Sequence, residues 1–243
     1  MKGLIKNVFR ALGYRIERIT PASVEFPITR PTRVKGVDIL ANKVFQDSVE
    51  SLGQTSLLDT PRLANLWHLS RMTDPLGSIA EVGSYRGGTA LHLSNACPER
   101  EILIFDAYSK ESFEKLDSKL DKTYYHGQFA DHSPEAVSRL LFGRKHRITQ
   151  GFFPQSVENV SLPKVSFVHL DVDVYQAIKK SLLYFLENDR MLAKSLIVVD
   201  DFNRGAAGVN QAVSEVITDV PGTAAFPLFP SQALIVPPSW SRS

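Results

Sequence analysis

Four aspartates follow two short aliphatic segments in the second half of the chain. Asp171 and Asp173 come after VSFVHL, and Asp200 and Asp201 come after LIVV. Such aliphatic runs are typical of strands buried on both faces, and the carboxyl ends of parallel strands open at one edge of the sheet. Carboxylates that converge there repel one another unless protons or a cation compensate. Asp171, Asp200 and Asp201 are therefore candidate ligands of Mg²⁺, which prefers oxygen ligands.

A structural alternative competes with this interpretation. An aspartate after a strand can cap the next helix, and Asp173 has the better position to cap the helix expected at Gln176–Asn188. The tandem Asp200-Asp201 is harder to explain in this way, so we favour a metal. A metal bound there could polarise a hydroxyl as a Lewis acid.

A glycine turn lies earlier in the chain, within the segment IAEVGSYRGGT at 79–89. Gly83 and Gly87 allow a tight turn from strand to helix and a close approach to a ligand. The spacing Glu81-x-Gly83-x-x-x-Gly87 differs from the G-x-G-x-x-G motif of dinucleotide-binding sites. S-adenosylmethionine carries no phosphate, and backbone groups with an acid such as Glu81 can meet its amino acid end. Asp106, at the end of the next strand, is placed to accept hydrogen bonds from the ribose hydroxyls.

A glycine and two phenylalanines follow the third expected strand. One of the two rings could flank an adenine, because aromatic faces stack well on bases, while the other would belong to the core. The candidate cofactor-binding residues are Glu81, Gly83, Ser84, Tyr85, Gly87, Thr89, Asp106, Gly151 and Phe152.

Beyond residue 78, strand patterns and helix patterns alternate along the chain, which predicts a doubly wound, mostly parallel α/β sheet with helices on both faces. The expected strands are Ile79–Val82, Ile102–Phe105, Arg147–Thr149, Val165–Leu170 and Ser195–Val199. The expected helices are Thr60 to about Met72, capped by Thr60, then Thr89–Cys97, Pro134–Phe142, Gln176–Asn188 and one after Gly208. Thr223–Phe226 and Gln232–Val236 would close the sheet as an antiparallel pair.

The bulk composition is that of one globular domain with an appended segment. The chain has 243 residues and a net charge of +2, yet residues 1–35 carry an excess of basic residues. A single cysteine, Cys97, excludes an internal disulfide and is typical of a reducing cytoplasm. No apolar run approaches a membrane span, and no basic patch with interleaved aromatic residues indicates nucleic-acid binding.

The first twenty residues predict a basic amphipathic helix. Such a helix can lie on an anionic membrane, but packing on protein is the more common use, so we expect a homo-oligomer and no membrane binding. We divide the chain into a helical lid and connector at residues 1–56 and an α/β domain at residues 57–243.

Between Leu57 and Val216 the sequence resembles the macrocin/mycinamicin-type O-methyltransferases, which use S-adenosylmethionine to methylate sugar hydroxyls of natural products. The resemblance rests on the combination of EVGSYRGGTA, FDAY, ITQGFFPQSV, HLDVDVYQAIKKSL and IVVDDFNRGAAGVNQAV. It implies a roughly seven-stranded sheet whose last strand is antiparallel. It also implies a cofactor site at Glu81, Gly83, Gly87 and Asp106, and Mg²⁺ on Asp171, Asp200 and Asp201.

The resemblance leaves the general base and the acceptor open. Related catechol-type enzymes carry a lysine three residues after the first metal acid, where this chain has Val174. His132, His126 and His169 are candidate bases by their chemistry, with His132 favoured, and Asp171 is the other candidate catalytic residue. We expect a small-molecule hydroxyl acceptor on a sugar of a secondary metabolite or surface polysaccharide. The alternatives are a catechol-like acceptor, a nicotinamide-dependent oxidoreductase, and a non-catalytic cofactor-binding or assembly protein.

Overall fold

The structure is a computed structural model that describes residues 39, 42–187 and 189–242. The helix predicted within the first twenty residues lies outside these residues, and so do residues 1–38 of the predicted lid and connector segment. All described residues belong to one compact unit, Lys35–Ser243. Among the described helices, none has the length and apolarity needed to cross a membrane.

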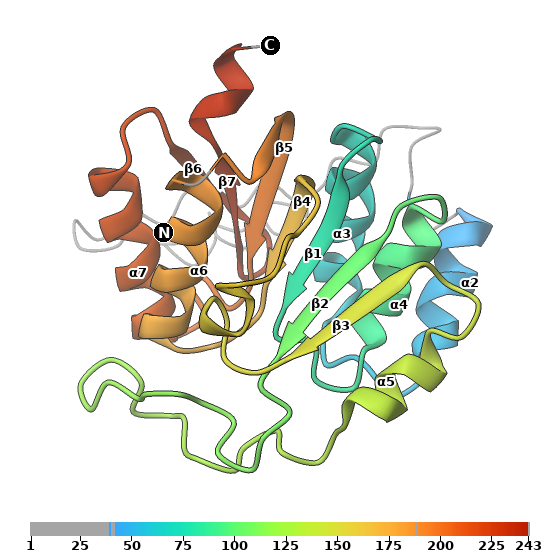
Figure 1. Cartoon of the computed structure of the whole chain (residues 1–243), viewed down its shortest axis with the longest axis horizontal. Helices are drawn as coiled ribbons and strands as arrows, with labels where there is room; N and C mark the ends of the chain where they lie inside the picture. Colours follow the sequence, from blue (N-terminus) through green and yellow to red (C-terminus); the bar gives the residue numbers. More distant parts are fainter. Residues whose placement is uncertain (1–38, 40–41, 188, 243) are drawn as a thin grey trace, which may run out of the picture. The chain divides into compact units, whose positions relative to one another are not determined.

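A seven-stranded sheet forms the centre of this unit (Figure 1), in the order β3-β2-β1-β4-β5-β7-β6. The strands are β1 (Ser78–Val82), β2 (Ile102–Asp106), β3 (His146–Gln150), β4 (Val165–Leu170), β5 (Met191–Val199), β6 (Ala224–Leu228) and β7 (Gln232–Val236). The first five are parallel, and β7 runs antiparallel to both β5 and β6. The predicted doubly wound sheet, with its closing antiparallel pair, is confirmed.

Helices cover both faces of the sheet and bury a separate apolar cluster on each. The helices α6 (Tyr175–Glu187) and α7 (Ala207–Asp219) pack on the face to which Ala80 and Val82 point. The opposite face, which receives Ile79, is covered by the other four helices (Figure 1). These are α2 (Lys43–Leu52), α3 (Thr60–Met72), α4 (Gly88–Ala96) and α5 (Pro134–Leu140). Because side chains alternate along a strand, neighbouring residues of β1 serve different faces.

The first two described helices differ from the sequence prediction in detail. Phe45 and Leu52 of α2 belong to the same buried cluster as α3 and α4, so the core extends into the predicted lid segment. At the start of α3 the cap is Asp59, whose carboxylate accepts a hydrogen bond from the Arg62 N–H at 3.1 Å. Thr60 is instead the first helical residue, because the longer-reaching carboxylate one position earlier occupies the capping geometry.

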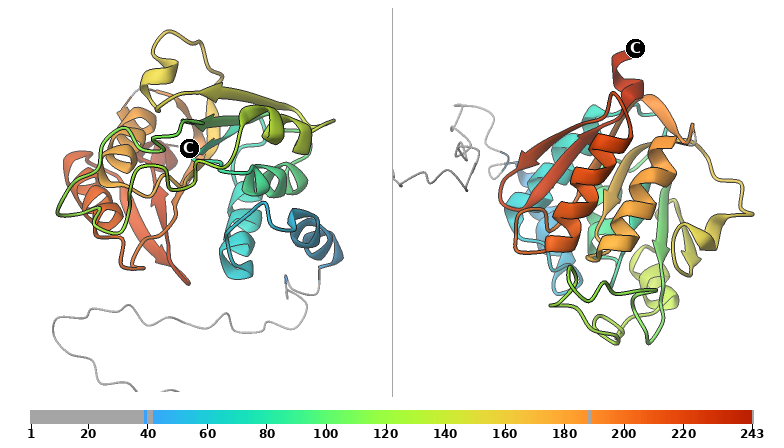
Figure 2. Two further views of the ribbon diagram at one scale, coloured as in Figure 1. Left: turned by 90° about the horizontal axis from the view of Figure 1, so that it is seen from below. Right: turned by 90° about the vertical axis from the view of Figure 1, so that its left-hand side faces the viewer.

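The long connection between β2 and α5, residues 107–133, contains neither helix nor strand. In Figure 1 and in both views of Figure 2 it crosses the carboxyl-terminal end of the sheet. Asp121, which is buried, anchors it to α6: its Oδ1 accepts a hydrogen bond from the Tyr175 N–H at 3.0 Å. Its Oδ2 accepts from the Asp117 N–H at 2.8 Å. One carboxylate therefore both orders the connection and satisfies the first N–H of a helix.

The turn after β1 passes very close to the end of β4. Gly83 has φ +84°, and a Cβ placed there would collide with the backbone carbonyl of Asp171. Glycine is therefore required for two separate reasons, the left-handed backbone conformation and the contact between the two chain segments.

His92 of α4 joins the three helices on its side of the sheet. It is buried, its Nε2 donates to the Leu63 carbonyl at 3.0 Å, and its Nδ1 lies 2.9 Å from the Ser48 hydroxyl. Burial lowers the pKa of His92 to about 4, although the hydrogen bond to Leu63 opposes the shift. The imidazole is thus held neutral among α2, α3 and α4.

Replacing Gly83 by alanine should destabilise the fold by more than about 3 kcal/mol, the combined cost of a left-handed alanine and an overpacked contact. The matched control is Gly143→Ala, at φ +79° with no atom within 4 Å of the added Cβ. That substitution should cost only about 1–2 kcal/mol. Urea unfolding of both variants measures the difference, and equal losses would contradict the close contact.

The neutral state of His92 predicts a pH dependence of stability. The pKa of His92 in the folded protein lies below the unfolded value of 6.5. The contribution of neutral His92 to the free energy of unfolding is therefore complete above pH 6.5 and is lost as the pH falls toward 4. Between pH 7.5 and pH 5 the free energy of unfolding should fall by about 2 kcal/mol more in the wild type than in His92→Gln. Urea unfolding at several pH values tests this, and parallel profiles for the two proteins would refute it.

Candidate functional site

A cavity of about 580 Å³ opens at the carboxyl ends of β1, β2, β4 and β5. The connection 107–133 and the segment Thr55–Leu58 form part of its wall. The predicted site residues that line it are Gly83, Ser84, Tyr85, Thr89, Asp106, His132, Gly151, Phe152, Asp171, Asp200 and Asp201. We call the part of the cavity formed by residues 83–85 and Asp106 the turn end. The part formed by the aspartates that follow β4 and β5, which are Asp171, Asp173, Asp200 and Asp201, is the acid end.

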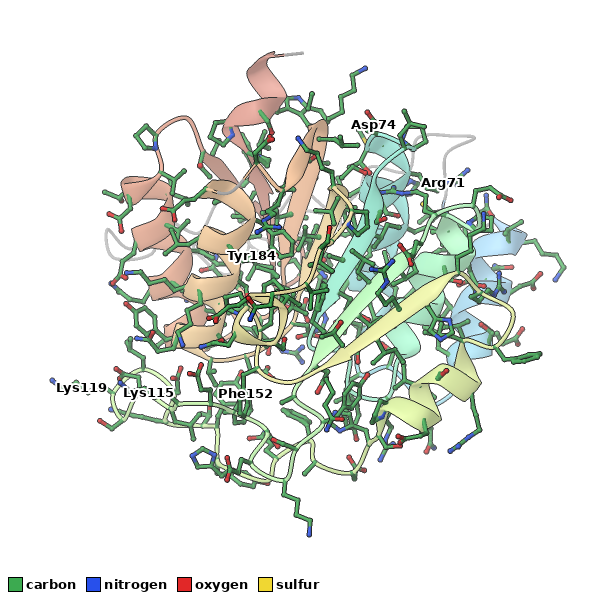
Figure 3. The ribbon with its side chains drawn as sticks, in the orientation of Figure 1. Arg71, Asp74, Lys115, Lys119, Phe152 and Tyr184 are labelled. Atoms are coloured by element: carbon green, nitrogen blue, oxygen red, sulfur yellow. The ribbon has the colours of Figure 1, made fainter. Side chains whose placement is uncertain are left out.

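Phe152 and Phe153 both line the cavity, and Phe153 also belongs to the apolar core, as one of the two was predicted to do. Phe152 is half-buried and lines the cavity, whereas Phe153 is buried and stacks on Phe185 with ring centroids 5.4 Å apart. Figure 3 shows Phe152 and Lys115 at one end of the molecule, with Arg71 and Asp74 at the other.

Two predicted cofactor residues, Glu81 and Gly87, do not line the cavity. Glu81 is the fourth residue of β1, and the alternation of the strand directs it toward the face covered by α4. It is fully buried there, and its Oε1 lies 3.1 Å from Nδ1 of His169. Burial raises the pKa of Glu81, and the His169 hydrogen bond opposes the shift. Gly87 has φ +80° and packs beside Val137 of α5, so it shapes the turn from outside the cavity.

Asp106 holds the glycine turn in shape. Its Oδ2 accepts hydrogen bonds from the backbone N–H groups of Ser84 and Tyr85, at 2.8 and 3.0 Å. Its Oδ1 accepts from the Tyr108 N–H at 3.0 Å and lies 3.1 Å from Nε2 of His132. Burial acts to raise the pKa of Asp106, but His132 and the backbone N–H groups lower it in net. Since a carboxylate has about four acceptor positions, protein donors already meet the acid that we expected to bind ribose.

His132 lies at the turn end of the cavity. Besides the contact with Asp106, its ring packs on Tyr85 and Tyr108, with centroids 5.4 and 5.1 Å away. Its Nδ1 is buried and has no hydrogen-bond partner among the described residues. The imidazole therefore offers a polar atom to a ligand beside the glycine turn. Its hydrogen bond and ring contacts are with Asp106, Tyr85 and Tyr108, and not with the aspartates at the acid end.

The other two candidate bases are occupied elsewhere. His126 is exposed, and its Nδ1 lies 2.9 Å from the backbone carbonyl of Glu111. His169 is fully buried against Glu81, on the opposite face of the sheet from α6. Neither lines the cavity.

The acid end gathers four carboxylates in a partly buried space. Burial, followed by the charge of Asp200, raises the pKa of Asp171 well above its usual range. Burial also raises the pKa of Asp200, although His169 and Arg62 oppose the shift. Burial and the neighbouring carboxylates thus both favour the protonated acids, and a bound cation would favour the ionised ones.

Asp173 also belongs to the acid end, although we predicted from the sequence that it caps the next helix. The first N–H of α6 is bound by Asp121 instead, and Asp173, at φ +62°, lines the cavity. Burial and then the charge of Asp201 raise the pKa of Asp173 well above its usual range. The Tyr124 hydroxyl lies 3.4 Å from Oδ2 of Asp201, so the connection 107–133 also reaches the acid end.

Arg62 is a second residue that sequence reasoning missed. Its Nη1 lies 2.5 Å from Oδ2 of Asp200 and 3.5 Å from Oδ1 of Asp201. The available signal was its position, because a cation in the first turn of a helix opposes the helix dipole. Such a local conflict indicates a tertiary partner, which here is the pair of acids after β5.

Among the described residues, no group of three or more His, Cys, Asp or Glu side chains is arranged to hold a metal ion. The predicted Mg²⁺ ligands therefore lie in one cavity without forming a three-carboxylate cage. The donor chemistry nevertheless suits a cation, because the carboxylates of Asp171, Asp200 and Asp201 line the same cavity. Mg²⁺ commonly keeps several waters and uses only one or two carboxylates.

Solved structures share this fold. The O-methyltransferase NovP is 17% identical with a TM-score of 0.64, covering 75% of this chain and 82% of NovP. The calicheamicin methyltransferase CalS11 is 18% identical with a TM-score of 0.57, covering 79% of this chain and 90% of CalS11. An O-methyltransferase from Bacillus cereus in complex with SAH is 14% identical with a TM-score of 0.53, covering 82% and 92%. No curated protein sequence is similar enough to count as a match.

The family comparison covers most of the α/β unit. The model of the macrocin-O-methyltransferase (TylF) family matches residues 56–219, which include every strand of the parallel part of the sheet and the whole cavity wall from Ser56 to Ala206. The chain therefore belongs to the macrocin-O-methyltransferase family, and the expected enzyme class, an S-adenosylmethionine-dependent O-methyltransferase, is confirmed.

Proposed function

We propose that this enzyme methylates a hydroxyl of a sugar, in a secondary metabolite or a surface polysaccharide, with the help of Mg²⁺. The observation that carries the proposal is that one cavity joins the glycine turn to four aspartates. A methyl donor at the turn end and a hydroxyl at the acid end would then face each other. Holding two reactants in fixed orientation is a large part of catalysis in such transfers.

We assign the turn end to S-adenosylmethionine, which supplies an electrophilic methyl group on a sulfonium when bound. Gly83, Ser84, Tyr85 and Thr89 would line the cofactor from the side of α4, and Gly151 and Phe152 from the turn after β3. Asp106 would act mainly by holding the turn. His132, whose buried Nδ1 has no hydrogen-bond partner among the described residues, would contact the cofactor and would not act as the base.

We assign the acid end to the acceptor and to Mg²⁺, with Asp171, Asp200 and Asp201 as the ligands. A bound divalent cation would offset the surplus negative charge and act as a Lewis acid toward the acceptor hydroxyl. Methylation of a hydroxyl releases its proton. Asp173, which lines the cavity and is not one of these ligands, has a raised pKa, which suits a carboxylate that accepts a proton.

Structural relatives support a sugar as the acceptor. CalS11 without ligand is described as a TDP-rhamnose 3'-O-methyltransferase, and its structure matches with 16% identity and a TM-score of 0.50. A catechol-like acceptor is the second candidate, because aromatic side chains line much of the cavity wall. These are Tyr85, Tyr108, Phe113, Tyr124 and Phe129. Homo-oligomer formation, a cytoplasmic location and the absence of nucleic-acid partners are further proposals from the sequence.

Calorimetric titration with S-adenosylhomocysteine, once with Mg²⁺ and once with EDTA, tests the assignment of the two ends. We expect binding in both conditions, because the turn end is built from protein groups alone. Acceptor screening would then begin with sugars and continue with catechols. Absence of binding in both conditions would overturn the cofactor assignment, and NADH would be titrated next.

Asp200→Asn should weaken Mg²⁺ binding by more than about tenfold, because it removes a charged oxygen ligand. Affinity for S-adenosylhomocysteine should change much less, because asparagine keeps an oxygen that can accept from Nη1 of Arg62, and metal-dependent turnover should be lost. The matched control is Asp219→Asn at the exposed end of α7. Calorimetry measures both affinities. Retained Mg²⁺ binding and turnover in the Asp200 variant would refute the metal assignment.

A further inference from the structure

Arg62 occupies an unusual position for a cation. Its side chain is only 7% exposed and that of Asp200 only 1%, so the contact between them is a buried ion pair. The same Nη1 atom lies 3.5 Å from Asp201. Removing one partner of such a pair leaves an uncompensated charge, which makes the contact a strong constraint on both residues.

The other side of the guanidinium contacts the chain just before α3. Nη2 donates to the backbone carbonyl of Leu57 at 3.2 Å. Nε lies 3.4 Å from Asp59, the residue that caps α3. The planar group thus reaches a carboxylate after β5 on one side and the backbone of a loop on the other.

That loop segment, Thr55–Leu58, lines the cavity and rests on the beginning of α4. The Thr55 carbonyl accepts a hydrogen bond from the Gly88 N–H at 3.2 Å, and the Ser56 hydroxyl lies 3.1 Å from that of Thr89. A Cβ on Gly88 would come within 2.5 Å of the Ser56 nitrogen, so the segment sits directly against the helix start. This helix start follows the glycine turn of the turn end.

We propose that Arg62 is a positioning residue that links the two ends of the cavity. Through Nη1 it holds Asp200 and Asp201, and through Nη2 it holds the segment Thr55–Leu58 against α4. The assignment rests on the proposed function, in which these ends receive Mg²⁺ with the acceptor and the cofactor. Arg62 occupies Oδ2 of Asp200, so it fixes the orientation of the carboxylate that would face an incoming cation.

Charge balance supports the same role. Burial disfavours the charge of the Arg62 guanidinium, but the nearby negative charges, including those of Asp200, Asp171 and Asp201, raise its pKa in net, so Arg62 is a permanent cation beside these acids. A lysine could supply the charge but not the geometry, because its single ammonium group cannot reach the Asp200 carboxylate and the Leu57 carbonyl with the fixed fork of a guanidinium.

The test compares Arg62→Met and Arg62→Lys with the wild type and with Arg71→Met. Arg71 lies on the same helix, is exposed, and stands at the opposite end of the molecule from Phe152 of the cavity wall (Figure 3). Calorimetry measures S-adenosylhomocysteine affinity, and electron paramagnetic resonance measures binding of Mn²⁺ as a substitute for Mg²⁺. Both Arg62 variants should weaken binding of each ligand by at least about tenfold, because the charged hydrogen bonds to Asp200 and to the Leu57 carbonyl are lost, and Arg71→Met should bind like the wild type.

The lysine variant separates positioning from folding and from charge. It keeps a buried cation, so it tests the proposal even if Arg62→Met fails to fold, and urea unfolding monitors both. Wild-type affinities in Arg62→Lys would overturn the positioning role, as would unchanged affinity for S-adenosylhomocysteine in both variants. When Mn²⁺ binds to the wild type, unchanged Mn²⁺ affinity in both variants would overturn the link to the acid end.

The wild-type measurements identify a failure of the proposed function by themselves. A wild type that binds S-adenosylhomocysteine but no Mn²⁺ would overturn only the Mg²⁺ assignment, and the S-adenosylhomocysteine comparison would still decide the role of Arg62. A wild type that binds no S-adenosylhomocysteine would overturn the cofactor assignment and the positioning role together.

Discussion

The register of the parallel strands is the constraint on which the site depends. The backbone N–H groups of Gly151, Gly83, Asp171 and Asp200 each donate to the neighbouring strand at 2.8–2.9 Å, one step beyond the last strand residue. The ends of β3, β2, β1, β4 and β5 are therefore held side by side. Since β1 and β4 flank the point where the strand order reverses, the turn end and the acid end meet at the usual ligand-binding position of this kind of sheet.

Electrostatics then decides how the acid end is used. Burial of several like charges in one cavity raises the pKa values of Asp171, Asp173 and Asp200, so the cavity favours a positively charged group. Arg62 supplies part of that charge from a helix on the opposite face of the sheet from α6 and α7. A divalent cation and a sulfonium would supply the rest, which is why a methyl donor and Mg²⁺ suit the same cavity.

Contacts between distant segments shape the wall around these charges. Asp121 fastens the connection 107–133 to α6, and Tyr124 brings it to Asp201. At its other end the connection is held by the ion pair of Asp131 with Arg86 and by His132 on Asp106. Ordering a loop of this length costs conformational entropy, and these few polar contacts offset part of that cost. They give the connection a defined surface toward the acceptor.

The sequence alone determined the sheet, its closing antiparallel pair and the glycine turn and aspartates that line the cavity at the strand ends, because buried parallel strands and glycine turns have strong local patterns. The tertiary structure decided which polar side chains can reach a ligand in the cavity. It directed Glu81 away from the cavity through the strand alternation, committed Asp106 to the turn, and moved Asp173 from a cap to the acid end. The place of Arg62 in the first turn of α3 indicates a tertiary partner, but no local pattern identifies that partner as Asp200, which lies 138 positions away.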